Sequence, residues 1–146
     1  MGTAEPGGPQ PVLHLGPDPA DLDRLYPWLE AAAAARNLPP AVRFGMHVAA
    51  EEAVANAARH AFAPDAPGEI AVRLCDLPDA AALVVEDTGR PFDPVAAPAR
   101  ERPASLRDAR PGGLGLTLLR HYCHDITYQR IDGRNHLTLR FPLPRR

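Results

Sequence analysis

The spacing of hydrophobic and polar positions predicts helices in the first part of the chain. A Gly/Pro-rich arm over residues 1–10 comes first. Leucines then recur at helical intervals after Asp18 and Pro19, which are typical of a helix N-cap and first helical position. Pro27 lies inside this helix and predicts either a kink or a later start. A second, longer helix is predicted over residues 41–62.

In most of the rest of the chain, apolar and polar residues alternate as they do in β-strands. The run that contains Ile70, Val72 and Leu74 places apolar residues on one face. The last two strands are joined through Asp132-Gly133, a strong signal for a tight hairpin turn. The predicted strands cover residues 12–15, 69–75, 83–86, 126–131 and 136–141.

A loop rich in Pro, Ala and Arg is predicted over residues 95–111, followed by a short helix over residues 113–122. Helices, antiparallel strands, a helix and a final hairpin follow one another in the chain. This order predicts an α+β fold, a two-layer sandwich in which helices cover one face of a mainly antiparallel sheet. With 146 residues, we expect one domain over residues 11–146.

Composition narrows the function classes. The net charge of −2 argues against a nucleic-acid binder that relies on bulk positive charge. All 16 basic residues are arginines, so no lysine can form a Schiff base or anchor a phosphate. Two cysteines make no disulfide framework, which favours a reducing compartment. Without a signal peptide or a long apolar run, we expect a cytoplasmic protein with no membrane contact.

Three segments carry candidate chemistry. The first is the predicted second helix, where Glu52, Asn56 and His60 are spaced four residues apart and share one face. A solvated polar stripe is the commoner explanation of such a face. The alternative is a metal and base site, in which the Asn56 amide oxygen suits Mg²⁺ and Glu52 takes a proton.

The second segment, residues 86–94, directly follows an apolar strand. Asp87 can accept a hydrogen bond from an exocyclic amine, and Gly89 removes a side chain where a flat ring must approach the backbone. An ordinary Gly/Pro turn is the alternative. The third segment, residues 112–117, is a glycine-rich helix start that can cradle an anion, although this signal is weak by itself. It matches neither a Walker loop nor a Rossmann fingerprint.

The three segments together are more specific. Glu-x-x-x-Asn on a helix, Asp-x-Gly-x-Pro-Phe after a strand and Gly-x-Gly at a later helix resemble the sequence boxes of the GHKL ATP-binding superfamily. The wording of residues 52–61 and 90–94 looks closest to the stand-alone anti-sigma factor serine/threonine kinases of bacterial partner-switching systems. The resemblance covers roughly residues 12–142.

The resemblance implies a role for each matching residue. Asn56 would hold Mg²⁺ on the ATP phosphates, and Glu52 would be the catalytic base for a serine hydroxyl. Asp87 would bind the adenine amino group, Gly89 would make room for the ring, and residues 95–111 would be the ATP lid. The other expected nucleotide contacts are Arg59, His60, Phe92, Arg110, Gly112, Gly113, Leu114, Gly115 and Thr117.

The resemblance also implies partners. Such kinases look like homodimers that bind a sigma factor and phosphorylate a small anti-anti-sigma protein, of the STAS type, on serine. The regulator can equally be something other than a sigma factor. One departure is Pro111, which stands where some members have an arginine; here Arg110 is one place earlier. Two alternatives therefore stay open: a non-catalytic, ATP-gated binding module, or the ATP-binding domain of a histidine kinase.

Overall fold

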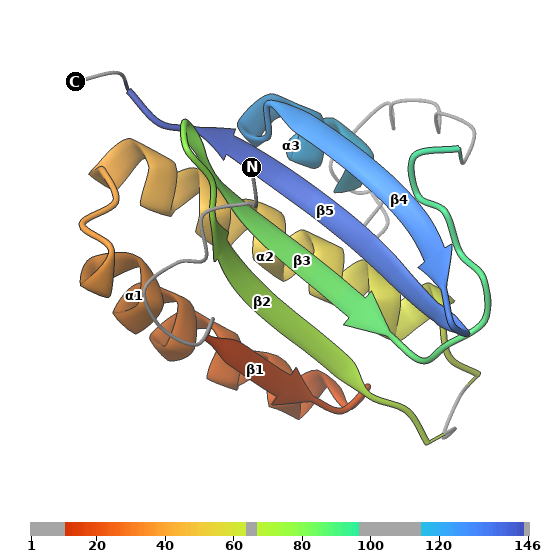
Figure 1. Cartoon of the computed structure of the whole chain (residues 1–146). Coiled ribbons are helices and arrows are strands. Elements are labelled where there is room, and N and C mark those ends of the chain that lie inside the picture. The colour runs from red at the N-terminus through yellow and green to blue at the C-terminus, as the bar shows by residue number, and fades with distance from the viewer. Residues whose placement is uncertain (1–10, 64–66, 97–114, 145–146) are drawn as a thin grey trace, which may run out of the picture.

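The computed structural model describes residues 11–63, 67–96 and 115–144 (Figure 1). The predicted N-terminal arm and all but the first two residues of the predicted lid lie outside these ranges. The elements in chain order are β1 (Val12–Leu15), the 3₁₀ helix η1 (Pro19–Arg24), α1 (Leu25–Ala35), α2 (Pro40–His60), β2 (Ile70–Asp76), β3 (Ala80–Asp87), α3 (Gly115–Tyr122), β4 (Asp125–Ile131) and β5 (Arg134–Pro142).

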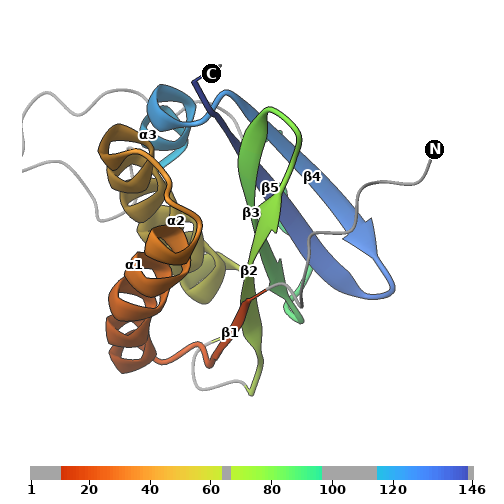
Figure 2. The ribbon, with the colours of Figure 1, turned by 60° about the vertical axis from the view of Figure 1, so that its left-hand side comes forward.

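The strands form one five-stranded sheet in the order β1-β2-β3-β5-β4, and every neighbouring pair is antiparallel. The three α-helices lie together on one face of this sheet (Figure 2). The predicted α+β fold with helices on one face is therefore confirmed.

The first predicted helix is divided in two. The Asp18 side chain accepts a hydrogen bond from the Ala20 N–H at 2.9 Å, which caps the short η1 helix. The α-helix proper begins only at Leu25, so Pro27 lies in its first turn, where a proline removes no helical hydrogen bond. Of the two outcomes that Pro27 predicted, the later start is the observed one.

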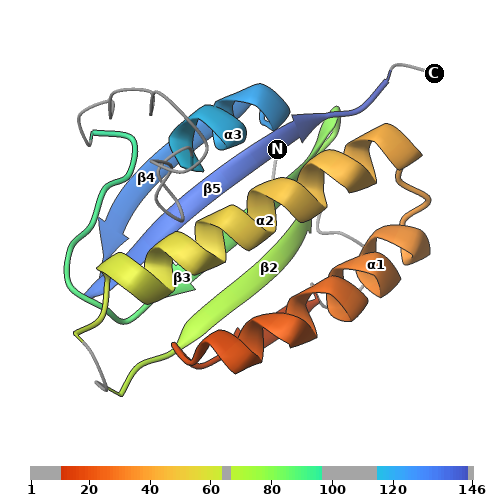
Figure 3. The same cartoon turned by 180° about the vertical axis from the view of Figure 1, so that it is seen from behind.

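Helix α2 crosses the sheet between α1 and α3 (Figure 3) and contacts β2, β3 and β5. Its buried residues are mostly small, including Ala49, Ala50 and Ala53, and these let the helix approach the strands closely. Against them pack the inward residues of the strands, which are large and fully buried, such as Ile70 and Leu83. Burial of each such side chain contributes about 1.5–3 kcal/mol.

The final hairpin has the predicted turn. Asp132 and Gly133 have φ of 50° and 76°, and a two-residue turn with both φ positive matches the twist of the flanking strands. Strand β3 is longer than the predicted 83–86. Its start was not predicted, because the alanines there do not alternate with polar residues. Among the described helices, none is long and apolar enough to cross a membrane.

Candidate active site

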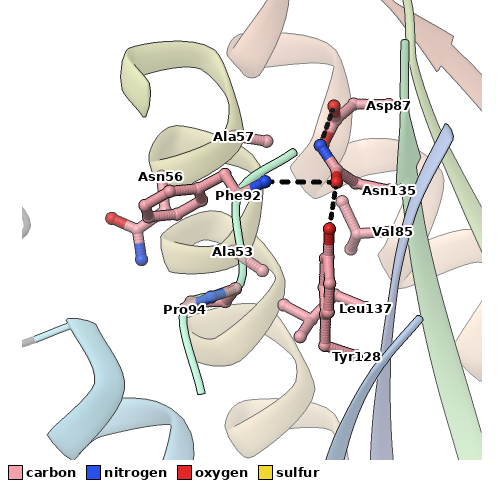
Figure 4. A pocket seen from close by; sticks show the side chains of 10 residues that line it. All are labelled: Ala53, Asn56, Ala57, Val85, Asp87, Phe92, Pro94, Tyr128, Asn135 and Leu137. Carbon is pink, nitrogen blue, oxygen red and sulfur yellow. Dashed lines mark hydrogen bonds between the residues drawn. The ribbon is translucent and has the colours of Figure 1, made fainter. Parts of the chain in front are cut away.

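A small pocket lies between α2 and the sheet, where β3 ends (Figure 4). Its free volume is about 20 Å³, which is room for one water molecule. Helix α2, strands β3, β4 and β5 and the segment after β3 all contribute side chains. The lining residues are Ala53, Asn56, Ala57, Val85, Asp87, Phe92, Pro94, Tyr128, Asn135 and Leu137.

Asp87 is the buried charged residue of this pocket. It is only 5% exposed, because it is the last residue of β3 and its side chain is on the same face as the buried Val85. Its Oδ1 atom accepts hydrogen bonds from the Gly89 N–H at 2.9 Å and from Asn135 Nδ2 at 2.8 Å. Burial raises the pKa of Asp87, while these two hydrogen bonds act in the opposite direction.

Asn135 and Tyr128 are site residues that the sequence analysis did not identify. Asn135 on β5 lies opposite Asp87 on β3 and is 3% exposed. The Tyr128 hydroxyl donates a hydrogen bond to Asn135 Oδ1 (Figure 4). One signal was present in the sequence. Asn135 begins the alternating row Leu137, Leu139 and Phe141, so it is a polar residue at an inward position of a strand.

Gly89 is needed for close packing against the end of α2. A Cβ at Gly89 would lie 2.3 Å from the carbonyl oxygen of Ala61, which also accepts the Arg90 N–H at 2.8 Å. The predicted reason for this glycine was room for a flat ring. The structure provides a different physical reason, since the missing side chain makes room for the backbone of Ala61.

Glu52 projects from α2 with its side chain 17% exposed. Its Oε1 atom is buried and makes no hydrogen bond within the described part of the chain, and the nearest cation, Arg59 Nη2, is 3.8 Å away. Burial raises the pKa of Glu52; Arg59 lowers it and the neighbouring Glu51 raises it further. A half-buried carboxylate with a raised pKa and an unused oxygen is suited to accept a proton.

Asn56 is one turn after Glu52 and lines the pocket, and its Oδ1 atom accepts a hydrogen bond from Arg59 Nη2 at 3.3 Å. The described residues contain no group of three or more His, Cys, Asp or Glu that could hold a metal. A cation beside Asn56 would take few protein oxygens from the described residues, with phosphate and water among its other ligands. That donor set fits Mg²⁺.

The other predicted nucleotide contacts lie in different parts of the chain, and some lie outside the described residues. His60 does not line the pocket; its ring stacks on Phe92 with 5.0 Å between ring centroids, so it supports a lining residue. Gly115 is the first described residue of α3, and Thr117 is exposed on that helix. The predicted contacts outside the described residues are Arg110, Gly112, Gly113 and Leu114.

A second cavity of about 170 Å³ lies between η1 and α2, and Arg59 is among its lining residues. Its lining is mostly apolar, with Leu15, Leu22 and Val54 among it. Its carboxylate, Asp18, already caps η1. The smaller pocket, by contrast, brings Asp87 and Asn56 together and has Glu52 beside it, so we place the chemistry there.

The chain thus has an antiparallel sheet covered by helices on one face, with a pocket that Asp87 and Asn56 line, and its class follows from the family match. Residues 15–141 match the family model described as a histidine kinase-like ATPase domain, and the chain belongs to that family. The predicted relationship to the GHKL superfamily is thereby confirmed, as is the expected class of enzyme at the level of a kinase-like ATPase.

The chain also resembles individual proteins. It is 42% identical over 117 residues to the serine/threonine-protein kinase BtrW of Bordetella bronchiseptica, covering 80% of this chain and 82% of that protein. This agrees with the predicted resemblance to the partner-switching kinases.

Two solved structures show the same fold. The RsbU and RsbW domains of Rv1364c from Mycobacterium tuberculosis match with a TM-score of 0.65 and 20% identity over 95% of this chain, which spans 34% of that chain. The histidine kinase domain of the Erythrobacter litoralis blue-light activated kinase EL346 matches with a TM-score of 0.53 and 18% identity, covering 82% of this chain and 61% of that one.

Proposed function

We propose that this chain is an ATP-dependent serine protein kinase and anti-sigma-type switch protein. It binds a sigma factor or another regulator and phosphorylates a small STAS-type antagonist on serine. The observation that carries the proposal is the buried Oε1 atom of Glu52, which makes no hydrogen bond within the described residues and lies beside a pocket lined by Asp87. The 42% identity to a serine/threonine-protein kinase supports the same reaction.

The adenine base is assigned to the pocket, with its amino group donating to the Asp87 carboxylate. The present volume of about 20 Å³ is too small for a purine. The wall formed by Phe92 and Pro94 follows β3 outside any helix or strand, so its side chains are the part that can move outward while the Phe92 N–H stays bonded to Asn135. ATP binding is therefore expected to displace these two side chains.

Phosphoryl transfer would take place on the α2 side. The serine oxygen attacks the γ-phosphorus, the bond to the ADP oxygen breaks, and the Glu52 carboxylate takes the serine proton. Arg59, 3.8 Å from Glu52 and 3.3 Å from Asn56 Oδ1, orients both side chains. Asn56 would hold Mg²⁺, which supplies neutralising charge on the phosphates.

A homodimer in the cytoplasm is part of the same proposal.

The test separates a kinase from a non-catalytic, ATP-gated binding module. Purified STAS-domain proteins from the same organism are incubated with the protein and γ-labelled ATP, and phosphoserine is located by mass spectrometry. Glu52→Gln should lower the transfer rate about a hundredfold or more while ATP still binds. Asp79→Asn, at an exposed position outside the pocket lining, should transfer at the normal rate.

Two results would contradict the proposal. Undiminished transfer by Glu52→Gln would remove Glu52 as the base. ATP-dependent binding of a STAS-domain protein by the wild type, with no phosphate on any serine, would identify a non-catalytic module instead.

A further inference from the structure

Asn135 connects the walls of the pocket. It lies on β5, opposite Asp87 of β3 on one side and Arg130 of β4 on the other. Its side chain is 3% exposed, in a mostly apolar layer where Asp87 is the other buried polar or charged residue among those described. A buried amide in such a place is costly unless its donors and acceptor are used.

Both donors of the amide are used. Asn135 Nδ2 donates to Asp87 Oδ1 at 2.8 Å and to the carbonyl oxygen of Arg90 at 2.7 Å. A flipped amide would turn its oxygen toward these two acceptors, so the chemistry of the partners fixes the orientation. The amide therefore presents only donors to Asp87.

The amide oxygen of Asn135 accepts hydrogen bonds from other parts of the pocket. It accepts hydrogen bonds from the Tyr128 hydroxyl at 2.5 Å, from Arg130 Nη1 at 3.1 Å and from the Phe92 N–H at 3.3 Å. One side chain thus fixes the Asp87 carboxyl group, the segment carrying Phe92 and the edge strand β4. Loss of this side chain would remove a hydrogen bond from each of them at once.

We propose that Asn135 is a positioning residue that gives the pocket its selectivity for a 6-amino purine over a 6-oxo purine; this rests on the proposed function. By donating to Asp87, it keeps that carboxyl group ionised and in one rotation, able only to accept. A 6-oxo purine would then place a carbonyl oxygen against a carboxylate. Without Asn135, Asp87 can rotate or take a proton and donate to that carbonyl.

The charges around Asp87 do not replace Asn135. Arg130 of β4 and His136 of β5 also favour the ionised form, but each acts on Asp87 through charge alone. The Gly89 N–H also donates to Asp87 Oδ1, but it belongs to the turn directly after Asp87. Asn135 is the described side chain that both donates to Asp87 and fixes the Phe92 segment.

The test measures dissociation constants for ATP and GTP by calorimetry in wild type and in Asn135→Ala. The variant should lose about tenfold or more in ATP affinity, since a hydrogen bond to a charged group is removed, with no equal loss for GTP. The ratio of the two constants should therefore fall. An equal loss for both nucleotides would mean a merely structural role and would overturn the proposal.

Asn135→Asp adds a readout that loss of packing cannot produce. It keeps the size of the side chain but sets a second carboxyl group against Asp87, and two such groups share one proton. The ATP affinity of the variant, divided by that of the wild type at the same pH, should fall as the pH rises from about 6 to 9. For Asn37→Asp, an exposed change of equal charge, this ratio should stay constant.

A ratio of Asn135→Asp to wild-type affinity that does not change with pH would overturn the proposal even if Asn135→Ala fails to fold. Failure of the selectivity proposal and failure of the proposed function give different results. A wild type that binds ATP, with an unchanged ATP/GTP ratio in the Asn135 variants, removes only this inference. A wild type that binds no nucleotide removes the proposed function as well.

Discussion

Glu52 owes its chemistry to where α2 places it. Its carboxyl group is withdrawn from water beside Asn56, yet its partner Arg59 is 3.8 Å away, beyond hydrogen-bond distance. Burial therefore outweighs the ion pair, and the pKa of Glu52 is raised. This position destabilises the charged form of Glu52, and no described residue hydrogen-bonds its Oε1 atom, which suits the proposed role as a base.

The raised pKa predicts the pH dependence of phosphoryl transfer. A base works only when ionised, so the rate should fall with decreasing pH through the pKa of Glu52, above the ordinary glutamate value. The measurement is the single-turnover transfer rate against pH at saturating ATP. An inflection at or below the ordinary glutamate value would contradict the assignment.

The same pKa predicts a stability effect. A carboxyl group with a raised folded-state pKa destabilises the fold above that pKa, and this penalty is absent below the unfolded-state value. Glu52→Gln should therefore raise the free energy of unfolding at about pH 7 by about 0.5–2 kcal/mol, with a smaller gain at about pH 4. Urea denaturation at both values measures the difference; a gain that is equal at both, or a loss at neutral pH, contradicts the prediction.

At the scale of elements, the end of α2 and the turn after β3 are held together at Gly89. Ala61, the C-cap of α2, accepts the Arg90 N–H at 2.8 Å and occupies the space that a side chain at Gly89 would need. This contact fixes the distance between the helix that carries Glu52 and the strand that ends in Asp87. Packing of these elements therefore sets the width of the site.

Gly89→Ala should cost about 1–3 kcal/mol of stability, because the backbone carbonyl of Ala61 cannot move as a side chain would. It should also weaken ATP binding. Gly133→Ala is the matched control: its Cβ would meet no atom within 4 Å, and its φ of 76° costs about 1–2 kcal/mol. Thermal unfolding and calorimetry on both variants would refute the account if Gly89→Ala binds ATP as tightly as Gly133→Ala.

Elements with a strict hydrophobic period were predictable, and the side-chain network was not. The β4–β5 turn follows from Asp132-Gly133 alone, because few residues tolerate positive φ. The later start of α1 could not be predicted, because Pro27 allows both a kink and a later start. Asn135 was missed because its partners, Asp87 and the Arg90 carbonyl, are far away in the sequence and meet it only in the sheet.

At the scale of the whole molecule, α2 belongs to both the core and the site. One side of the helix buries Ala49, Ala50 and Val54, while Asn56 lines the pocket. Nucleotide binding is therefore expected to stabilise the entire domain. Saturation at about 100 times Kd adds about 2.7 kcal/mol, which thermal unfolding with and without ATP would detect.

The most direct test is calorimetric titration of ATP, with and without Mg²⁺, into wild type, Asp87→Asn and the exposed control Asp79→Asn. We predict binding that Mg²⁺ strengthens, that Asp87→Asn abolishes and that Asp79→Asn leaves unchanged. Wild-type protein that binds no ATP, or Asp87→Asn that binds it normally, would contradict the placement of the nucleotide.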